Sequence, residues 1–201
     1  MNKKLKQAGI LLGILILPSL FYVVLSTGEH QIGRAPFFGP KEIHPTKKIK
    51  RDIPDTIFYS VPDYGFTDLQ GNKRSLGDLS GQIVVVNFFC LDCYDENFRV
   101  LEQMGKLHAR FKDKPEVTLL SVLIDSANKG SLPDAMDEYP MGTSGWEIWE
   151  PVGDWQVFAK ESLLLGTEFS DFALNPGTLV LLDGDRHIRG YYDGKQYVET
   201  N

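Results

Sequence analysis

Asn87-Phe88-Phe89-Cys90-Leu91-Asp92-Cys93-Tyr94 is the stretch that decides the fold, and it contains both cysteines of the chain. It closes the run Ile83–Phe89, whose β-branched and aromatic side chains are typical of a strand covered on both faces. From Asp95 onward, apolar side chains return every three or four residues as far as Phe111, which predicts an amphipathic helix. The Cys-x-x-Cys pair therefore lies at a strand-to-helix junction.

This junction suits reversible disulfide exchange or the binding of a soft metal ion. We expect Cys90 at the exposed N-terminus of the helix, where unpaired N–H groups and the helix dipole favour a thiolate, and Cys93 one turn deeper. Cys90 would then attack a partner disulfide and Cys93 would resolve the mixed disulfide. A structural disulfide, or two reduced cysteines in the core, is the alternative.

The remaining elements follow from apolar runs and turn residues. Residues 117–124 form a second buried-type strand, and its link to the first through a helix predicts a parallel unit. We expect further strands at 64–67 and 74–76 around a turn, at 146–149, and in a closing hairpin of 178–182 with 188–192. Short helices are expected at 133–139 and 154–165. This order predicts an α/β fold of thioredoxin type, with a mixed central sheet flanked by helices.

The N-terminal part is of a different kind. Residues 8–25 form an uncharged apolar run of about 18 residues after three lysines, close to the length that crosses a hydrocarbon core of about 30 Å. We interpret residues 1–27 as a single-pass membrane anchor with the lysines in the cytoplasm and the rest of the chain outside. A cleaved signal peptide is the alternative.

Residues 28–55 contain four prolines and a cluster of basic side chains without helical or strand periodicity. We interpret them as an extracytoplasmic linker in coil conformation, ahead of one domain at residues 56–201. Within the linker, Phe37 and Phe38 would either pack back onto the domain or contact a partner. The net charge of −6 argues against nucleic acid as a partner.

Three segments resemble the Sco/SenC family: Phe66 to Gly71, Gly81 to Cys90, and the closing pair Leu181 to Gly184 and Ile188 to Gly194. The last of these, with Arg-Gly-Tyr-Tyr-Asp-Gly, is the most specific. Members of this family are membrane-anchored thioredoxin-fold proteins of cytochrome c oxidase copper-site assembly. The resemblance implies the same fold, a copper-related function, and an acidic residue at the position of Asp125.

The chain departs from the family in two places. The family spaces its cysteines by three residues, whereas two residues separate Cys90 from Cys93. Its third copper ligand is a histidine just before the closing hairpin, where this chain has Asn175 and Pro176, which are expected to face the cysteines. In thioredoxin-fold reductases the proline of this loop is cis. Two thiolates can still bind Cu(I), but Cu(II) prefers an added imidazole.

The sequence thus predicts a Sco-like thiol-disulfide redox protein acting in oxidase copper-site assembly through Cys90 and Cys93. Two alternatives stay open: a Cu(I) metallochaperone that uses the two sulfurs as ligands, and a general reductase of the cytochrome maturation (TlpA-like) type. A degenerate scaffold is a further one. The expected partner is a protein disulfide or a copper-site client such as an oxidase subunit. The expected location is a bacterial-type inner (cytoplasmic) membrane, with the domain on the periplasmic side.

Overall fold

The computed structural model describes residues 7, 12–14, 16–22, 35–50, 53–91, 94–125, 132–174 and 176–196. The chain divides into two compact units, Met1–Arg34 and Ala35–Asn201. In the first unit, residues 12–14 and 16–22 are helical and expose apolar side chains such as Leu17 and Phe21. None of the helices in the described residues combines the length and apolarity that a bilayer crossing requires. Residues 8–11, 15 and 23–25 lie outside the described set, so the anchor stays a prediction.

The second unit is built on a mixed sheet of seven strands in the order β4-β3-β7-β6-β5-β8-β9. Strands β5, β6 and β7 are parallel, and the pairs β3–β4, β3–β7, β5–β8 and β8–β9 are antiparallel. The strands span Gly65–Asp68 (β3), Lys73–Ser75 (β4), Ile83–Phe89 (β5), Val117–Leu123 (β6), Trp146–Pro151 (β7), Thr178–Leu182 (β8) and Ile188–Asp193 (β9). The predicted mixed α/β sheet of thioredoxin type is confirmed.

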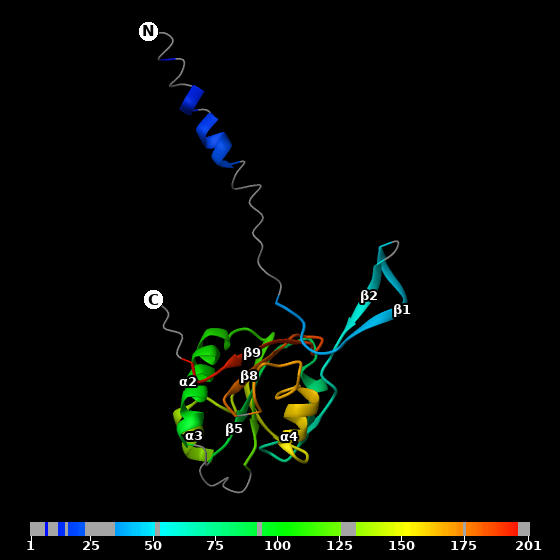
Figure 1. Ribbon diagram of the computed structural model, residues 1–201. Helices are drawn as coiled ribbons and strands as arrows, with labels where there is room; N and C mark the ends of the chain where they lie inside the picture. Colours follow the sequence, from blue (N-terminus) through cyan, green and yellow to red (C-terminus); the bar gives the residue numbers. More distant parts are fainter. Residues whose placement is uncertain are drawn as a thin grey trace. The chain divides into compact units, whose positions relative to one another are not determined.

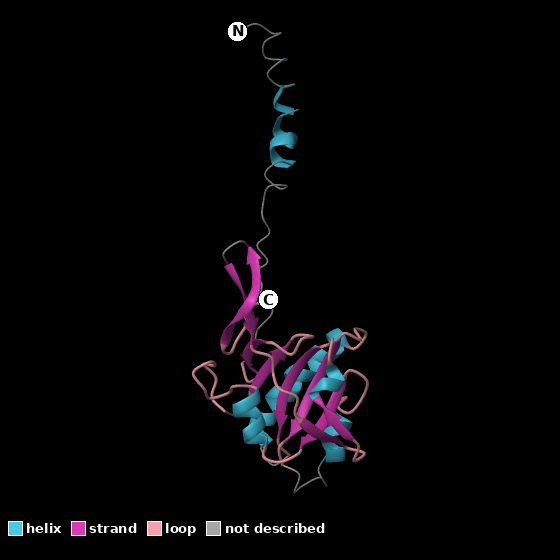
Figure 2. Ribbon diagram, turned by 90° about the vertical axis from the view of Figure 1, so that its right-hand side faces the viewer, coloured by secondary structure: helices cyan, strands magenta, loops and turns pink. Residues whose placement is uncertain are grey.

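Strand β5 lies inside the sheet because both of its faces are apolar. Val84, Val86 and Phe88 point into a core on one face, and Phe89 points into a second core on the other. Helices α2 (Tyr94–Phe111) and α3 (Leu132–Glu138) cover the second core, whereas α4 (Trp155–Val157) and the turns η1 (Leu76–Leu79) and η3 (Phe158–Ser162) cover the first (Figure 1). Figure 2 shows the strands of the sheet from a view turned by 90°. The junction that contains Cys90 therefore lies between β5 and α2, within the central β5–α2–β6 unit of the domain.

The helix predicted at 154–165 is shorter in the structure. Asp154 caps α4 by accepting a hydrogen bond from the backbone N–H of Gln156 at 2.8 Å. The chain then widens into the π-helical turn η3, which ends at Ser162. Leu164 has a φ of +58°, in the left-handed region that a right-handed helix cannot use. The apolar spacing predicted the buried face correctly, but it could not show where the backbone would stop.

The region predicted as a coil linker contains a β-hairpin. Strands β1 (Lys41–Lys50) and β2 (Ile53–Phe58) pair antiparallel and form a separate two-stranded sheet. Both strands contain proline and many polar residues, so apolar periodicity gave no signal for them. The expected coil conformation is therefore wrong over these strands, while the division of the chain at residues 27 and 55 stays a prediction.

Phe37 and Phe38 pack back onto the domain, which decides between the two alternatives left open for them. The ring of Phe37 stacks on that of Phe58 at 4.0 Å between centroids, and the ring of Phe38 meets the edge of Tyr191 at 5.1 Å. The backbone N–H of Phe38 also donates to the carbonyl of Ile188 at 3.0 Å. Residues 35–40 thus form a strap along β9.

Candidate functional site: a disulfide at the carboxyl edge of the sheet

Cys90 directly follows the last residue of β5 and is only 6% exposed. Its sulfur is in a disulfide, and the described residues contain no free cysteine. The chain has one other cysteine, Cys93, which lies outside the described residues. Cys90 is therefore an oxidised sulfur held at the end of a central strand.

The placement of Cys90 differs from the exposed position expected for it. Helix α2 begins at Tyr94, so Cys90 lies four residues before the helix, and Cys93 is the residue that directly precedes it. Cys90 is buried because it continues the strand that carries Phe88 and Phe89 into opposite cores. The expectation of an exposed Cys90 at the helix N-terminus is therefore wrong. The predicted helix, from Asp95, starts within one residue of the observed one, so the expectation failed in placing Cys90 at its N-terminus.

The strand registers bring three predicted residues to one edge of the sheet. Phe89 of β5 pairs with Leu123 of β6, so Cys90 and the half-buried Asp125 follow the ends of neighbouring parallel strands. Val86 pairs with Val180 of the antiparallel β8, and Pro176 lies two residues before the start of β8 at the same edge. Cys90, Asp125 and Pro176 therefore share the carboxyl edge of β5. Asn175 and the Asn175–Pro176 peptide bond lie outside the described residues, so the expected cis proline is untested.

The two residues before Cys90 pack into apolar cores on opposite faces of the sheet. Phe88 contacts Trp155 at 5.3 Å between ring centroids, and Phe89 packs in the core with Val100 and Leu101 of α2. Cys90 thus follows a strand end that apolar packing holds on both faces, and its own side chain is buried. A buried sulfur is less accessible to an incoming disulfide than an exposed one.

Two of the three described histidines lie far from Cys90. His187 precedes β9, whose Ile188 is paired with Leu182 and through it with Val84, six residues before Cys90 and hence about 20 Å away along the strand. His108 lies in α2, about 20 Å along the helix from Tyr94, and its Nε2 is 3.1 Å from the carbonyl oxygen of Ser144. His44 belongs to β1, in the separate two-stranded sheet. His108 and His187 are thus too far from Cys90 to complete a copper site there.

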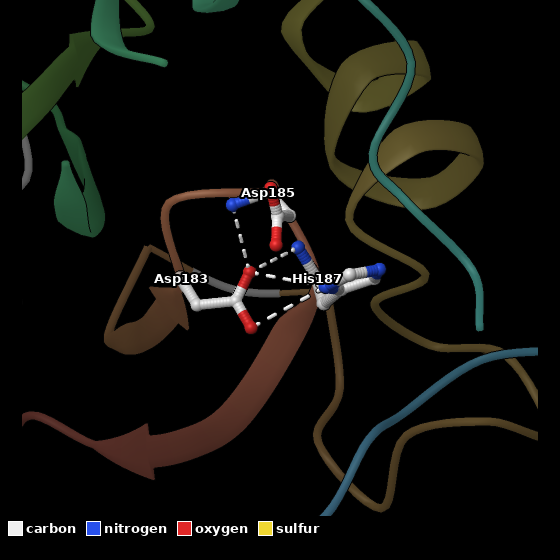
Figure 3. Close-up of side chains that lie close together, drawn as sticks. All are labelled: Asp183, Asp185 and His187. Atoms are coloured by element: carbon white, nitrogen blue, oxygen red, sulfur yellow. Dashed lines mark hydrogen bonds and ion pairs between the residues drawn. The ribbon is translucent and has the colours of Figure 1, made fainter. Parts of the chain in front are cut away.

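Asp183, Asp185 and His187 form a second cluster with ligand-type side chains, in the turn between β8 and β9 (Figure 3). The carboxylate of Asp183 already accepts hydrogen bonds from the backbone N–H groups of Asp185 at 3.1 Å and His187 at 2.9 Å, and its Oδ1 lies 3.2 Å from Nδ1 of His187. Its Oδ2 accepts from the guanidinium of Arg189 at 2.9 Å. These contacts fill the acceptor positions that a cation would need, and the Arg189 charge opposes a cation.

The electrostatics of Asp183 agree with this interpretation. Burial alone would raise the pKa of Asp183, but hydrogen bonds from Arg189 and the His187 N–H, together with the His187 charge, hold it below its ordinary value. Arg189 also donates to the carbonyls of Ala35 and Pro36, and its guanidinium lies 3.9 Å from the centroid of the Phe37 ring. This Asp183–Arg189 lock fastens the strap to β9. It is a structural element that sequence spacing did not predict.

A chain of buried side-chain hydrogen bonds, which links three neighbouring strands of the sheet, was also not predicted from the sequence. Asn87, Ser121 and Trp146 are all fully buried and lie on neighbouring strands. The indole N–H of Trp146 donates to Oγ of Ser121 at 2.9 Å, and Ser121 donates to Oδ1 of Asn87 at 2.7 Å. The signal available in the sequence was a polar residue inside each of two apolar strand runs, because such residues need partners from neighbouring strands.

Comparisons with known proteins support the fold. A scan against protein-family models finds no match, and a search of curated proteins finds none. Among solved structures, BsSco, a member of the Sco family of cytochrome c oxidase assembly proteins, matches with a TM-score of 0.56 and 20% identity over 75% of this chain and 90% of its own. A SCO1/SenC family lipoprotein from Bacillus anthracis matches with a TM-score of 0.55 and 20% identity, over 68% of this chain and 85% of its own.

A third match is the thioredoxin domain of a thiol-disulfide oxidoreductase from Bacteroides vulgatus, with a TM-score of 0.50 and 23% identity over 68% of this chain and 90% of its own. These identities carry the fold alone. The resemblance to Sco proteins is thus confirmed at the level of the three-dimensional structure, and the chain has a thioredoxin-like fold shared by Sco proteins and thiol-disulfide oxidoreductases.

Proposed function

We propose that the chain is a Sco-like thiol-disulfide redox protein of cytochrome c oxidase copper-site assembly, with Cys90 and Cys93 as its redox pair. The observation that carries this proposal is the oxidised Cys90 at the carboxyl edge of β5, about 20 Å along the strand from His187. The similar folds of BsSco and of the Bacteroides vulgatus thiol-disulfide oxidoreductase support it. A dithiol without imidazole favours redox exchange over Cu(II) binding.

The reaction follows from the burial of Cys90. In the reduced chain, the thiolate of Cys93 attacks one sulfur of a client disulfide, the client S–S bond breaks, and the released client thiolate takes up a proton. The Cys90 thiol then loses its proton and attacks the sulfur of Cys93, which releases the second client thiolate. The client gains two electrons and two protons, and the chain ends as the Cys90 disulfide. An external dithiol returns the chain to the reduced state.

The same two sulfurs could instead hold Cu(I), which accepts two thiolate ligands. A full chain embedded in lipid nanodiscs separates the two functions. We expect it to reduce a peptide disulfide that models a copper-site client, with turnover driven by a dithiol, and to lose turnover in both Cys90→Ser and Cys93→Ser. Asp185→Asn, which lies at the far end of β8, is the matched control and should keep full turnover.

A Cu(I) titration with a competing chelator completes the test. Stoichiometric Cu(I) binding combined with no disulfide turnover would contradict the redox function and favour the metallochaperone. Turnover that persists in either cysteine variant would exclude the pair as the reacting groups. Exchange with any disulfide, and no preference for the client peptide, would favour a general reductase.

We further propose that residues 8–25 anchor the chain in the cytoplasmic membrane with the domain on the periplasmic side. The uncharged run behind Lys3, Lys4 and Lys6 supports this orientation. An uncleaved anchor should keep the chain with membranes after a high-salt wash and preserve Met1 in the mature protein. A mature N-terminus near Gly28 would establish a signal peptide instead.

A further inference from the structure

A groove of about 710 Å³ lies on the α2 side of the sheet, at the end remote from Cys90. Its floor comes from Ile83 and Val85 of β5, Leu181 of β8 and Tyr192 of β9. Its wall is the C-terminal half of α2, from Gln103 to Phe111. Ile83 is the first residue of β5 and Cys90 follows the last, so a molecule bound here leaves the disulfide edge accessible.

The floor of this groove is apolar surface that the described residues leave uncovered. Ile83 is 43% exposed and Tyr192 is 52% exposed, although the neighbouring Leu179 and Leu119 are buried. Sheets that contain parallel strands are normally covered by helices on both faces. Such an exposed patch beside a helix is typical of an interaction surface.

The shape of the groove favours a helix as its occupant. A helix packed beside α2 needs an axis separation of 8–10 Å, and its apolar stripe would rest on the floor made by β5, β8 and β9. Two concave grooves cannot fill one another, so a second copy of this domain is a poor fit. A face-to-face dimer would also bring the same basic rim residues of both copies together.

The basic side chains at the rim of the groove favour an occupant with acidic side chains. Lys106 and Arg110 both line the groove and lie four residues apart on α2, so they project along the same side of the helix. The exposed Lys106 pairs with the half-buried Glu102 at 2.9 Å, a contact of little energetic weight at the surface. The guanidinium of Arg110 lies 5.8 Å from the centroid of the Phe111 ring. Carboxylates four residues apart on an incoming helix would meet both cations.

We propose that this groove binds an amphipathic helix of a partner protein, with its apolar stripe on the floor and acidic side chains against Lys106 and Arg110. The helical residues 12–14 and 16–22 of this chain contain no acidic side chain and lack that match. The proposal is independent of the redox function, because the groove lies at the other end of β5. It gives the protein a docking surface separate from its reactive edge.

The test uses the full chain in nanodiscs and two synthetic fluorescent peptides as probes. Both peptides are helical and share one leucine stripe, and they differ only in a flank of glutamates or lysines facing α2. Fluorescence anisotropy, with empty nanodiscs subtracted, should show saturable binding of the glutamate peptide at least about tenfold tighter than of the lysine peptide. The double variant Lys106→Glu and Arg110→Glu should reverse this preference. Lys112→Glu with Lys114→Glu, the same charge change outside the groove, should preserve it.

The variants lie on the surface, and unchanged thermal unfolding monitored by circular dichroism shows that they fold. Three results would overturn the proposal. These are no binding of either peptide, a preference that the charge reversal does not move, and a concentration-dependent dimer in sedimentation that Tyr192→Glu dissociates. The last would identify a second copy as the occupant.

Discussion

Each end of the β5–β8 pair brings together side chains of the kinds that bind metals, and the two ends differ in the contacts that these side chains make. At one end, Cys90, Asp125 and position 176 converge at the carboxyl edge of the sheet. At the other, Asp183, Asp185 and His187 lie close enough together for their ligand atoms to hold a metal. By residue type alone, the second end is the better metal site.

The contacts reverse that ranking. The carboxylate oxygens of Asp183 already contact two backbone N–H groups, the His187 ring and the Arg189 guanidinium. They therefore have no acceptor position left for a cation. The carboxyl edge of β5 holds a disulfide sulfur instead, which can exchange its bond with an incoming thiolate. Ligand-type side chains therefore indicate a functional site only where their hydrogen-bonding capacity is not already used by the fold.

The largest effect is expected from breaking the lock. Asp183→Ala removes the partner of Arg189 and of two backbone N–H groups, and should lower the free energy of unfolding by about 2–4 kcal/mol. Asp185 contacts Asp183 through its backbone N–H and not through its carboxylate. Asp185→Ala should therefore change the free energy of unfolding by less than about 0.5 kcal/mol. Urea unfolding followed by tryptophan fluorescence measures both.

A metal role for the lock would give a different result. Zn²⁺ at about 100 times its dissociation constant would stabilise a true site by about 2.7 kcal/mol. We expect no shift of the wild-type unfolding midpoint with Zn²⁺. A shift that Asp183→Ala abolishes would contradict the structural role.

The second-largest effect is expected when a histidine is introduced at the Cys90 end of the β5–β8 pair, since neither strand contains one. Pro176→His places a histidine just before β8, at the sheet edge where Cys90 lies, and should create a coloured Cu(II)-thiolate complex, with Cu(II) affinity at least about tenfold above wild type. Asn175→His is the companion variant, because Asn175 occupies the position suggested by the family resemblance. Absorption spectra during Cu(II) titration measure the effect.

His187→Ala is the matched control and should leave the copper spectra unchanged, since His187 lies at the far end of β8. An intense Cu(II)-thiolate band in wild type that disappears in His187→Ala would show that the two ends are closer than the registers indicate.

The smallest effect is the acid sensitivity of the lock. Because the pKa of Asp183 is lowered in the folded chain, its contribution to stability is complete above the ordinary value of 3.8 and is lost as pH falls through the folded pKa. Asp183→Asn should therefore lose less stability than wild type between pH 5 and pH 2. Asp68, whose pKa is lowered chiefly by the Asn72 side chain, adds the same trend to both proteins. Urea midpoints across this pH range give the difference, and equal slopes would contradict it.

The sequence predicted the central elements well, because burial on both faces leaves a clear pattern. The strand at 83–89 has the predicted bounds, and the strand at 117–124 ends one residue early. The predicted strands also indicated the sheet edge at which Cys90 lies. Features that depend on contacts between distant residues were not predicted. The hydrogen bond from Arg189 to the carbonyl of Ala35, for example, spans 154 positions of the chain. The burial of Cys90 was missed because Cys90 was assigned to the helix N-terminus, although the helix predicted from Asp95 begins five residues after it and Cys90 continues the buried strand.

The reactivity of each cysteine alone tests the central claim most directly. Cys90→Ser and Cys93→Ser chains in nanodiscs are reduced and mixed with an aromatic disulfide that releases a coloured thiol. We predict that the chain retaining Cys93 reacts at least about tenfold faster than the chain retaining the buried Cys90, and that urea removes the difference because it exposes both sulfurs. A faster reaction of Cys90 in the folded protein, or folded chains in which neither cysteine reacts, would contradict a redox pair with Cys93 as the attacking sulfur.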